Sequence, residues 1–121
     1  MIRLKRVYDP ASNDDGVRLL VERLWPRGVK KTDLRLDGWL KDVAPSTELR
    51  RWFSHDPAKW TEFQQRYFDE LDAHSETVEP ILKASGQGYV TLLFSSHDAA
   101  HNNAVALETY IAAHRGRHDR R

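Results

Sequence analysis

The stretch YVTLLF, residues 89–94, is the clearest strand in the sequence and decides the fold class. It is a short, continuous apolar run with β-branched and aromatic residues, which is typical of a strand covered on both faces. The turn-forming stretch SSHD, residues 95–98, follows it, and residues 99–114 then show the spacing of a helix with one apolar side. A buried strand followed by a helix indicates an α/β domain.

Two segments nearer the N-terminus also predict strands. Residues 2–8 alternate apolar and polar side chains, as in a strand near a sheet edge, and residues 17–24 contain the apolar run LLV. The turn-rich stretch 9–16 separates them. Because a parallel crossover usually needs about a dozen residues or more, a hairpin is the alternative to a parallel arrangement of these two strands.

The segment between the strands predicted at 17–24 and 89–94, residues 30–85, is predicted to be helical. Asp37 is expected to cap a short helix, and Ser46 is expected to cap the next one. The dipeptide DP at residues 56–57 is a strong helix start, and Pro80 breaks or restarts the helix that follows it. The side chains at helical spacing after that start form one stripe: Trp60, Phe63, Tyr67 and Leu71.

Composition fits one soluble domain. The chain has 121 residues, of which 40% are hydrophobic and none is cysteine, so disulfides, thiolate metal sites and cysteine nucleophiles are excluded. No apolar run approaches the roughly 18 residues of a membrane span, and residues 1–6 lack a signal-peptide core. We expect a cytoplasmic, compact α/β domain over residues 1–114, with a small, mostly parallel sheet of about three strands packed by helices. A basic, flexible tail is expected at residues 115–121.

Positive charge is concentrated towards both ends of the chain. Residues 1–35 hold nine Lys or Arg against five Asp or Glu, whereas residues 36–90 hold six against ten. The tail at residues 115–121 has four arginines and one aspartate. Such a tail can grip phosphates, but a solvated terminus is the more common case. A nucleic-acid or protein-partner binding module that uses the basic N-terminal third and the tail is therefore the alternative function.

Ligands of open α/β sheets bind beyond the carboxyl ends of the strands, which points to two segments of this chain. The first is RLWPRG at residues 23–28. Arg23 and Arg27 offer guanidinium groups to a carboxylate or phosphate, and Trp25 offers a face for stacking. The structural alternative is that Arg23 pairs with a core acid and that Trp25 fills the core.

The second segment, SSHDAAHNN at residues 95–103, opens the last predicted helix, where free amides favour an anion. His101 can act as a general acid or base near neutral pH. Asp98 either orients His101 or caps the helix, and capping is the more common use. Asn102 and Asn103 carry amide groups that are expected to orient the ligand.

Other signals are weaker. His97 and His101 are four residues apart, but the sequence specifies no third ligand, so no metal site is predicted. His55 either lines a pocket or closes one helix while Asp56 caps the next, and we favour the structural use. There is no phosphate-binding loop, nucleophile elbow or dinucleotide fingerprint, so no cofactor is indicated. No motif specifies an oligomeric state.

Several short motifs together carry a resemblance to a known family. They are KRVY (5–8), RLWPRG (23–28), WLK (39–41), APS (44–46), LR (49–50), WF (52–53), HDP (55–57) and HNNA (101–104). In this order and spacing they resemble the YeaO-like branch of domain-of-unknown-function family 488, over residues 2–112. The resemblance implies a compact α/β domain of bacterial, cytoplasmic type, and it implies no substrate or activity. His97 stands where the family pattern has lysine, which weakens the positive charge at that position.

The leading hypothesis is that the protein binds a small anionic ligand, bearing a phosphate or carboxylate, where the two segments meet at the rim of the sheet. The predicted ligand-binding residues are Arg23, Trp25, Arg27, Asn102 and Asn103, with His101 and Asp98 as the catalytic pair if the protein is an enzyme. A third possibility is that these motifs serve the structure only.

Overall fold

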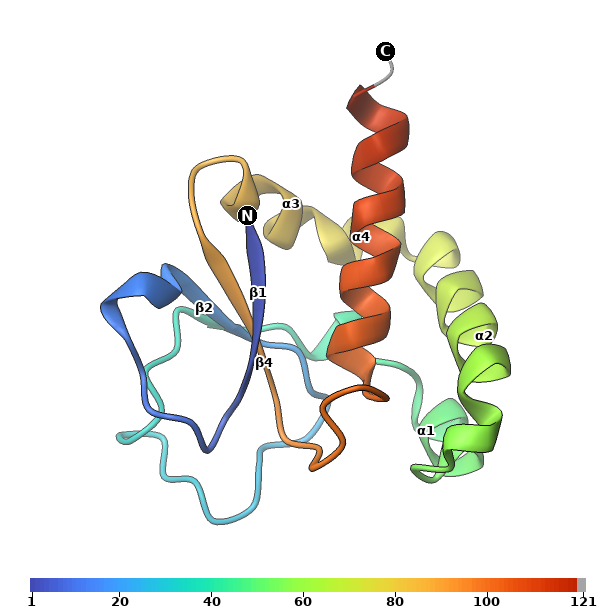
Figure 1. Cartoon of the computed structure of the whole chain (residues 1–121), viewed down its shortest axis with the longest axis horizontal. Helices are drawn as coiled ribbons and strands as arrows, with labels where there is room; N and C mark the ends of the chain where they lie inside the picture. Colours follow the sequence, from blue (N-terminus) through green and yellow to red (C-terminus); the bar gives the residue numbers. More distant parts are fainter. Residues whose placement is uncertain (120–121) are drawn as a thin grey trace.

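The structure is a computed structural model that describes residues 1–119, with the side chains of residues 1–114. Its four strands form one sheet, in which every neighbouring pair is parallel, in the order β1-β4-β2-β3 (Figure 1). The strands are β1 (Ile2–Arg6), β2 (Val17–Leu20), β3 (Gly38–Trp39) and β4 (Val90–Phe94). β4 pairs with both β1 and β2, so Leu92 faces Leu4 on one side and Leu19 on the other. The parallel α/β class is confirmed, the hairpin alternative is wrong, and β1 is an edge strand as predicted.

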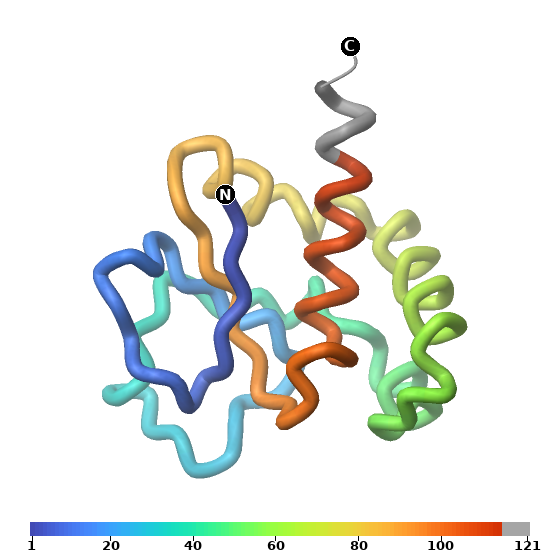
Figure 2. The backbone as a smooth tube through the Cα atoms, in the orientation of Figure 1, coloured from blue at the N-terminus to red at the C-terminus, as the bar shows by residue number. Residues whose placement is uncertain are grey.

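Within residues 1–119, four α-helices accompany the sheet: α1 (Thr47–Phe53), α2 (Trp60–Ala73), α3 (Glu79–Ser85) and α4 (Asn103–Asp119). They gather on one side of it, where α4 runs beside the sheet and α1 and α2 lie beyond α4 (Figures 1 and 2). Among the residues that the structure describes, no helix is long and apolar enough to cross a bilayer.

Two of the predicted helix starts, at Ser46 and Asp56, are confirmed. The Ser46 hydroxyl accepts a hydrogen bond from the Leu49 amide over 3.1 Å at the start of α1. Asp56 accepts one from the Ala58 amide over 3.0 Å and so caps the short 3₁₀ turn that leads into α2. In the predicted stripe on α2, Phe63, Tyr67 and Leu71 are buried. Trp60, the first residue of the stripe, is half-buried.

Both faces of the central strands are covered. Leu92 and its neighbours on one face join the core formed with the helices, whereas Leu20 and Leu93 join a second cluster on the other face. That second cluster is completed by Leu34 and by the half-buried Trp25 and Trp39. The long segment between β2 and β3 therefore covers the face that the helices leave open. This explains why all five residues of β4 are buried.

The prediction that the helical region begins near residue 30 is wrong. Residues 30–46 contain loops, the two-residue strand β3 and one 3₁₀ turn, and the sheet has four strands where about three were expected. Asp37 caps no helix, because its carboxylate accepts a hydrogen bond from the Arg18 amide over 2.8 Å. The Asp37 amide in turn donates to the Arg18 carbonyl, and the Leu40 amide donates to Leu20. These long-range backbone bonds hold the segment against β2.

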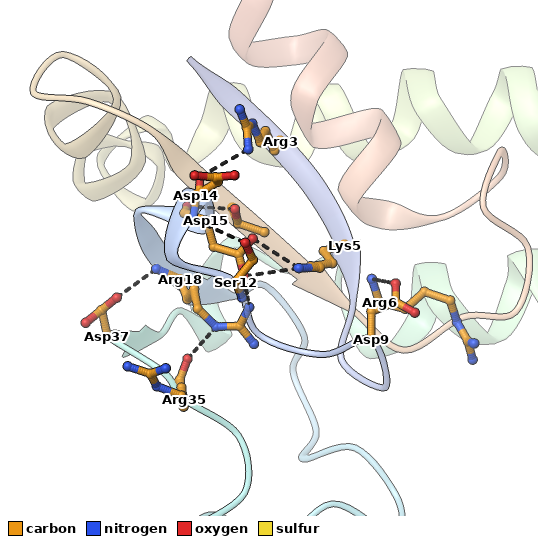
Figure 3. A network of polar contacts seen from close by, with 11 residues as sticks. Arg3, Lys5, Arg6, Asp9, Ser12, Asp14, Asp15, Arg18, Arg35 and Asp37 are labelled. Atoms are coloured by element: carbon orange, nitrogen blue, oxygen red, sulfur yellow. Dashed lines mark hydrogen bonds and ion pairs between the residues drawn. The ribbon is translucent and has the colours of Figure 1, made fainter.

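A polar network ties the loop between β1 and β2 to the sheet (Figure 3). Asp15 is buried, and its carboxylate accepts hydrogen bonds from Lys5 on β1 over 3.1 and 3.2 Å and from the Arg18 guanidinium on β2. Arg18 also donates to the Arg35 carbonyl over 2.6 Å, and the Thr91 hydroxyl of β4 donates to the Asp15 carbonyl over 2.7 Å. The Asp15 carboxylate therefore joins β1 and β2, the Asp15 carbonyl adds β4, and Arg18 extends the network to the loop before β3.

The last predicted helix starts later than expected. Residues 95–102 form a loop, and α4 begins at Asn103, whereas the apolar spacing indicated a start near residue 99. The backbone of α4 continues to Asp119. The side chains of the basic tail at residues 115–121 lie outside the described part of the chain, so the separate behaviour of that tail stays a prediction.

Candidate functional site

A cavity of about 170 Å³ lies where β2 and β4 end, between the start of α4 and the end of α1. The lower part of Figure 1 shows these elements approaching one another. The cavity is lined by Glu22, Pro45, Arg50, Phe53, His55, Phe63, Ser95, Ser96, His101, Asn102 and Asn103. It is smaller than the roughly 300–1,000 Å³ of pockets for drug-sized molecules, so it suits a small ligand.

One wall of the cavity is made where the two central strands end. Glu22 follows β2, and its Oε1 accepts hydrogen bonds from both the amide and the hydroxyl of Ser95, over 2.8 and 3.0 Å. Ser95 is the first residue after β4. The Trp39 indole donates to the Glu22 carbonyl over 2.6 Å, so both the backbone and the side chain of Glu22 are held. The other carboxylate oxygen, Oε2, has no hydrogen-bond partner among the described residues.

Arg50 supplies the positive charge. It lies on α1 between Leu49 and Phe53, which are buried in the core, and is itself half-buried. Among the described residues its only hydrogen bond is a long one of 3.4 Å, from Nη2 to the Thr47 hydroxyl. The Nε atom is buried and unpaired, and Nη1 also has no partner in the described part of the chain. Buried polar groups are nearly always hydrogen-bonded, so this guanidinium has donor capacity that the fold does not use.

Asp98 and His101 form a pair at the edge of the cavity. One Asp98 oxygen accepts the amides of Ala100 and His101 over 2.9 and 3.0 Å, and the other lies 2.9 Å from His101 Nδ1. These hydrogen bonds, led by that of the Ala100 amide, hold the pKa of Asp98 below its usual value. An ionised carboxylate accepts from Nδ1–H, which leaves Nε2 of His101 as the atom available to a ligand. The imidazole also packs against Trp60 in a T-shaped arrangement, with ring centroids 5.3 Å apart.

Asn102 and Asn103 line the cavity but are also tied to the fold. Asn102 is buried, accepts the Val105 amide over 3.0 Å and donates to the Asp98 carbonyl over 2.9 Å, so it caps the start of α4. Asn103 donates to the Val21 carbonyl over 2.6 Å and so fixes α4 to the end of β2. Their amide groups shape the cavity wall, and each already makes at least one hydrogen bond within the protein.

The three predicted residues of the first segment lie outside the cavity lining. Arg23 donates to the carbonyls of Ala44 and Pro45 over 3.0 and 3.3 Å. Trp25 donates to the Val29 carbonyl over 2.6 Å and packs in the second core cluster. Arg27 is exposed. The structure therefore brings together His101, Asn102 and Asn103, with Asp98 beside them. The ligand-binding roles of Arg23, Trp25 and Arg27 stay predictions.

Arg50 and Glu22 carry the charges of the cavity, and sequence reasoning assigned neither of them to the site. Arg50 follows a residue of the buried stripe on α1, so a half-buried position could be read from helical spacing. Glu22 directly follows the apolar run at residues 19–21 of the second predicted strand, near the rim where ligands bind. His55, also considered, lies in the cavity lining and is largely exposed. Across the described residues, no group of three or more His, Cys, Asp or Glu side chains is placed to hold a metal ion.

The fold and the cavity define a small parallel α/β domain with a polar pocket at the carboxyl rim of its sheet. A family model described as "Inactive DUF488-N3 subclade" matches residues 1–121. The uncharacterized protein YeaO of Escherichia coli (strain K12) is 43% identical over 110 residues, which cover 91% of this chain and 96% of that protein. This chain therefore belongs to the YeaO-like DUF488 family, as the motifs predicted.

Two mycobacterial proteins show a similar level of identity. Uncharacterized proteins Rv3073c of Mycobacterium tuberculosis (strain ATCC 25618 / H37Rv) and Mb3100c of Mycobacterium bovis (strain ATCC BAA-935 / AF2122/97) are each 42% identical over 106 residues. The match covers 88% of this chain and 89% of each relative. A search of solved structures gave no significant match.

Proposed function

We propose that this protein binds a small anionic ligand in the rim cavity and holds it without turning it over. The observation that carries the proposal is the Arg50 guanidinium, which lies in the cavity wall with a buried, unpaired Nε and an unpaired Nη1 among the described residues. An unsatisfied buried donor costs about 1–3 kcal/mol, and more when it is charged. A ligand oxygen that accepts from this group recovers part of that cost.

The burial of the Arg50 guanidinium atoms determines which of them a ligand reaches first. Nε is buried in this structure, so an incoming carboxylate would meet Nη1 of Arg50 first. A small rotation of the head group would then present Nη1 and Nη2, or Nε and Nη2, on one edge, which gives the bidentate geometry that favours guanidinium over ammonium. The positive end of the α4 dipole lies on the same cavity, next to Asn102 and Asn103, and favours the same sign of ligand charge.

The described geometry offers His101 as a further hydrogen-bond partner. With Nδ1 held by Asp98, Nε2 can accept a hydrogen bond when the ring is neutral and donate one when it is charged. The description of the matching family as an inactive subclade favours holding over proton transfer. A catalytic role for His101 and Asp98 remains a prediction that a turnover assay of any bound ligand would test.

A thermal-shift screen at constant ionic strength tests the proposal with acetate, propionate, inorganic phosphate and short nucleic acids as probes. The melting temperature of the wild type and of the Arg51→Gln variant should rise with a small anion, because binding to the native state stabilises it. Arg51 is the matched control, since it is the next residue on α1 and is exposed. The Arg50→Gln variant should show no rise.

Two results would count against this function. An equal rise in the Arg50→Gln variant would place the anion elsewhere. A rise with nucleic acid alone, which disappears as salt increases, would favour the nucleic-acid alternative, because such binding weakens steeply with salt.

A further inference from the structure

The cavity wall holds two opposite charges that do not neutralise each other. Arg50 and Glu22 both line it, yet neither forms an ion pair with the other or with any other described residue. Half-buried charges are usually paired, since each loses part of its hydration. Two unpaired opposite charges on one small cavity indicate a ligand that satisfies both.

We infer that the ligand of this cavity is amphoteric: a small carboxylic acid that also carries a hydroxyl or ammonium group. Its carboxylate would accept from Arg50, and its donor group would reach Glu22 Oε2. This inference rests on the proposed function, because it assumes that Arg50 holds an anion in the same cavity.

The position of Glu22 makes it a defined acceptor. Its Oε1 is held by the two hydrogen bonds from Ser95, so the carboxylate plane is fixed and Oε2 is left without a described partner. A hydrogen bond to a charged acceptor contributes more than a neutral one, and a ligand that lacks the donor leaves this oxygen unmatched. Glu22 therefore selects for a donor on the ligand.

The same carboxylate argues against a phosphate. With neutral imidazoles, Arg50 and Glu22 give the cavity wall no net charge, and the Asp98 carboxylate adds a negative charge behind His101. A phosphate dianion would meet Glu22 with nothing to donate to it, and like charges at short range repel. A monoanion with a donor group avoids this repulsion.

The remaining lining limits the skeleton of the ligand. Phe53 and Phe63 stack with ring centroids 4.3 Å apart, and with Pro45 they form the apolar part of the wall. A cavity of about 170 Å³ leaves room for few non-hydrogen atoms. The inferred class is thus a short hydroxy or amino acid with a compact carbon chain.

Calorimetric titration with a matched series of probes tests the inference. Propionate carries the anion alone, lactate and alanine add a donor at the second carbon, 3-hydroxypropionate and β-alanine add one at the third, and inorganic phosphate is the dianion. We expect at least one donor-bearing probe to bind about ten-fold more tightly than propionate, the effect of one good hydrogen bond. Phosphate should bind most weakly.

The Glu22→Gln variant isolates the acceptor. Its amide oxygen can still accept both hydrogen bonds from Ser95, whereas an NH₂ group replaces Oε2, so the cavity shape is kept and the charge is lost. The preference for the donor-bearing probe should disappear, and propionate and phosphate should bind more tightly than they bind the wild type. The wild-type series stands alone as a test if this variant proves unstable.

The possible failures are distinguishable. Propionate binding that depends on Arg50 but equals that of every donor-bearing probe would overturn the inference and leave the proposed function standing. Tighter binding of phosphate than of all carboxylates by the wild type would have the same effect. No Arg50-dependent binding of any probe would overturn both.

Discussion

The Asp98 carboxylate lies 2.9 Å from His101 Nδ1 with one oxygen while its other oxygen accepts the amides of Ala100 and His101. Orienting the histidine and capping the last helix were the two alternatives for this aspartate. It contacts His101, but it does not cap α4: its second oxygen closes the turn before the helix, and Asn102 caps α4 itself. A side chain that contacts the imidazole and closes the turn at once couples the shape of the loop after β4 to the tautomer of a residue in the cavity wall.

Substitutions of Asp98 should separate the two uses. Serine can still accept an amide at a cap but is too short to reach the imidazole, whereas alanine can do neither. In Asp98→Ser, we expect the Nδ1–H tautomer of His101 to lose its preference, while the melting temperature stays close to that of the wild type. Asp98→Ala should release the tautomer and also lower the melting temperature. Nitrogen NMR of the histidine ring and thermal unfolding of both variants measure the two effects, and an unchanged His101 tautomer in both would contradict the coupling.

Arg50 should weaken the protein when no ligand is bound. Its unpaired buried Nε–H has no described partner, so replacing the guanidinium by an apolar chain of similar length removes a polar group that the fold does not satisfy. We expect Arg50→Met to raise the free energy of unfolding by up to about 1 kcal/mol, as is common when a functional residue is removed. Urea unfolding compares it with Arg51→Met, which should be near neutral. A loss of more than about 1 kcal/mol in Arg50→Met alone would show that Arg50 serves the structure.

The Asp15 network of Figure 3 should dominate the acid sensitivity of the fold. Burial is the largest single influence on the pKa of Asp15 and raises it, but the hydrogen bonds from Ser12, Lys5 and Arg18 together outweigh it and lower the pKa below 3.8. A carboxyl whose pKa is lower in the folded state stabilises the protein above its unfolded pKa. That stabilisation is lost as the pH falls through the folded value.

The Asp15→Asn variant measures this contribution. It leaves the Arg18 guanidinium buried without its counter-charge, which typically costs about 3–5 kcal/mol. The deficit in the free energy of unfolding should be full at pH 7 and should shrink as the pH falls through the lowered folded pKa of Asp15. Asp14→Asn, a change at the exposed neighbour, is the control. A deficit that stays constant down to pH 2 would contradict the assigned role of the charge.

Two glycines with positive φ should respond differently to the same change. Gly16 has φ +64°, and an added Cβ would collide with the Tyr89 carbonyl, which accepts the Val17 amide at the start of β2. Gly28 has φ +72° with nothing within 4 Å of such an atom. Gly28→Ala should cost about 1–2 kcal/mol from backbone strain alone. Gly16→Ala should lower the free energy of unfolding clearly more. Equal losses of the two variants in chemical denaturation would show that small shifts of the structure remove the collision with Tyr89.

The parts of the fold that the sequence predicted have local causes. The buried strand at 89–94, the edge strand and the caps at Ser46 and Asp56 each depend on side chains within a few residues of one another. The region 30–46 does not. A two-residue strand has no period to detect, and β3 is held by backbone bonds to β2 and by the Asp37 carboxylate on the Arg18 amide. Tertiary contacts thus override the local signals there.

In the candidate site too, local features could be predicted from the sequence, whereas those that depend on tertiary contacts could not. The segment after β4 reaches the cavity because a loop joins a strand end directly to a helix start, which is a local feature. Beyond Glu22, the predicted residues of the segment after β2 lie outside the lining, and Arg23 instead donates to the carbonyls of residues 44 and 45, far along the chain. Arg50 and Glu22 line the same cavity only because α1 packs near the end of β2, so no spacing in the sequence joins the two residues.

The amide-region NMR signal of Arg50 Nε–H, followed during titration with lactate and propionate, tests the binding account most directly. We expect this signal to shift in a saturable way and the Nε–H signal of the exposed Arg51 to stay in place. Saturation at Arg50 alone would place the anion on the guanidinium that the fold leaves unpaired. Equal, linear drift of both signals, or no change in either, would contradict the account.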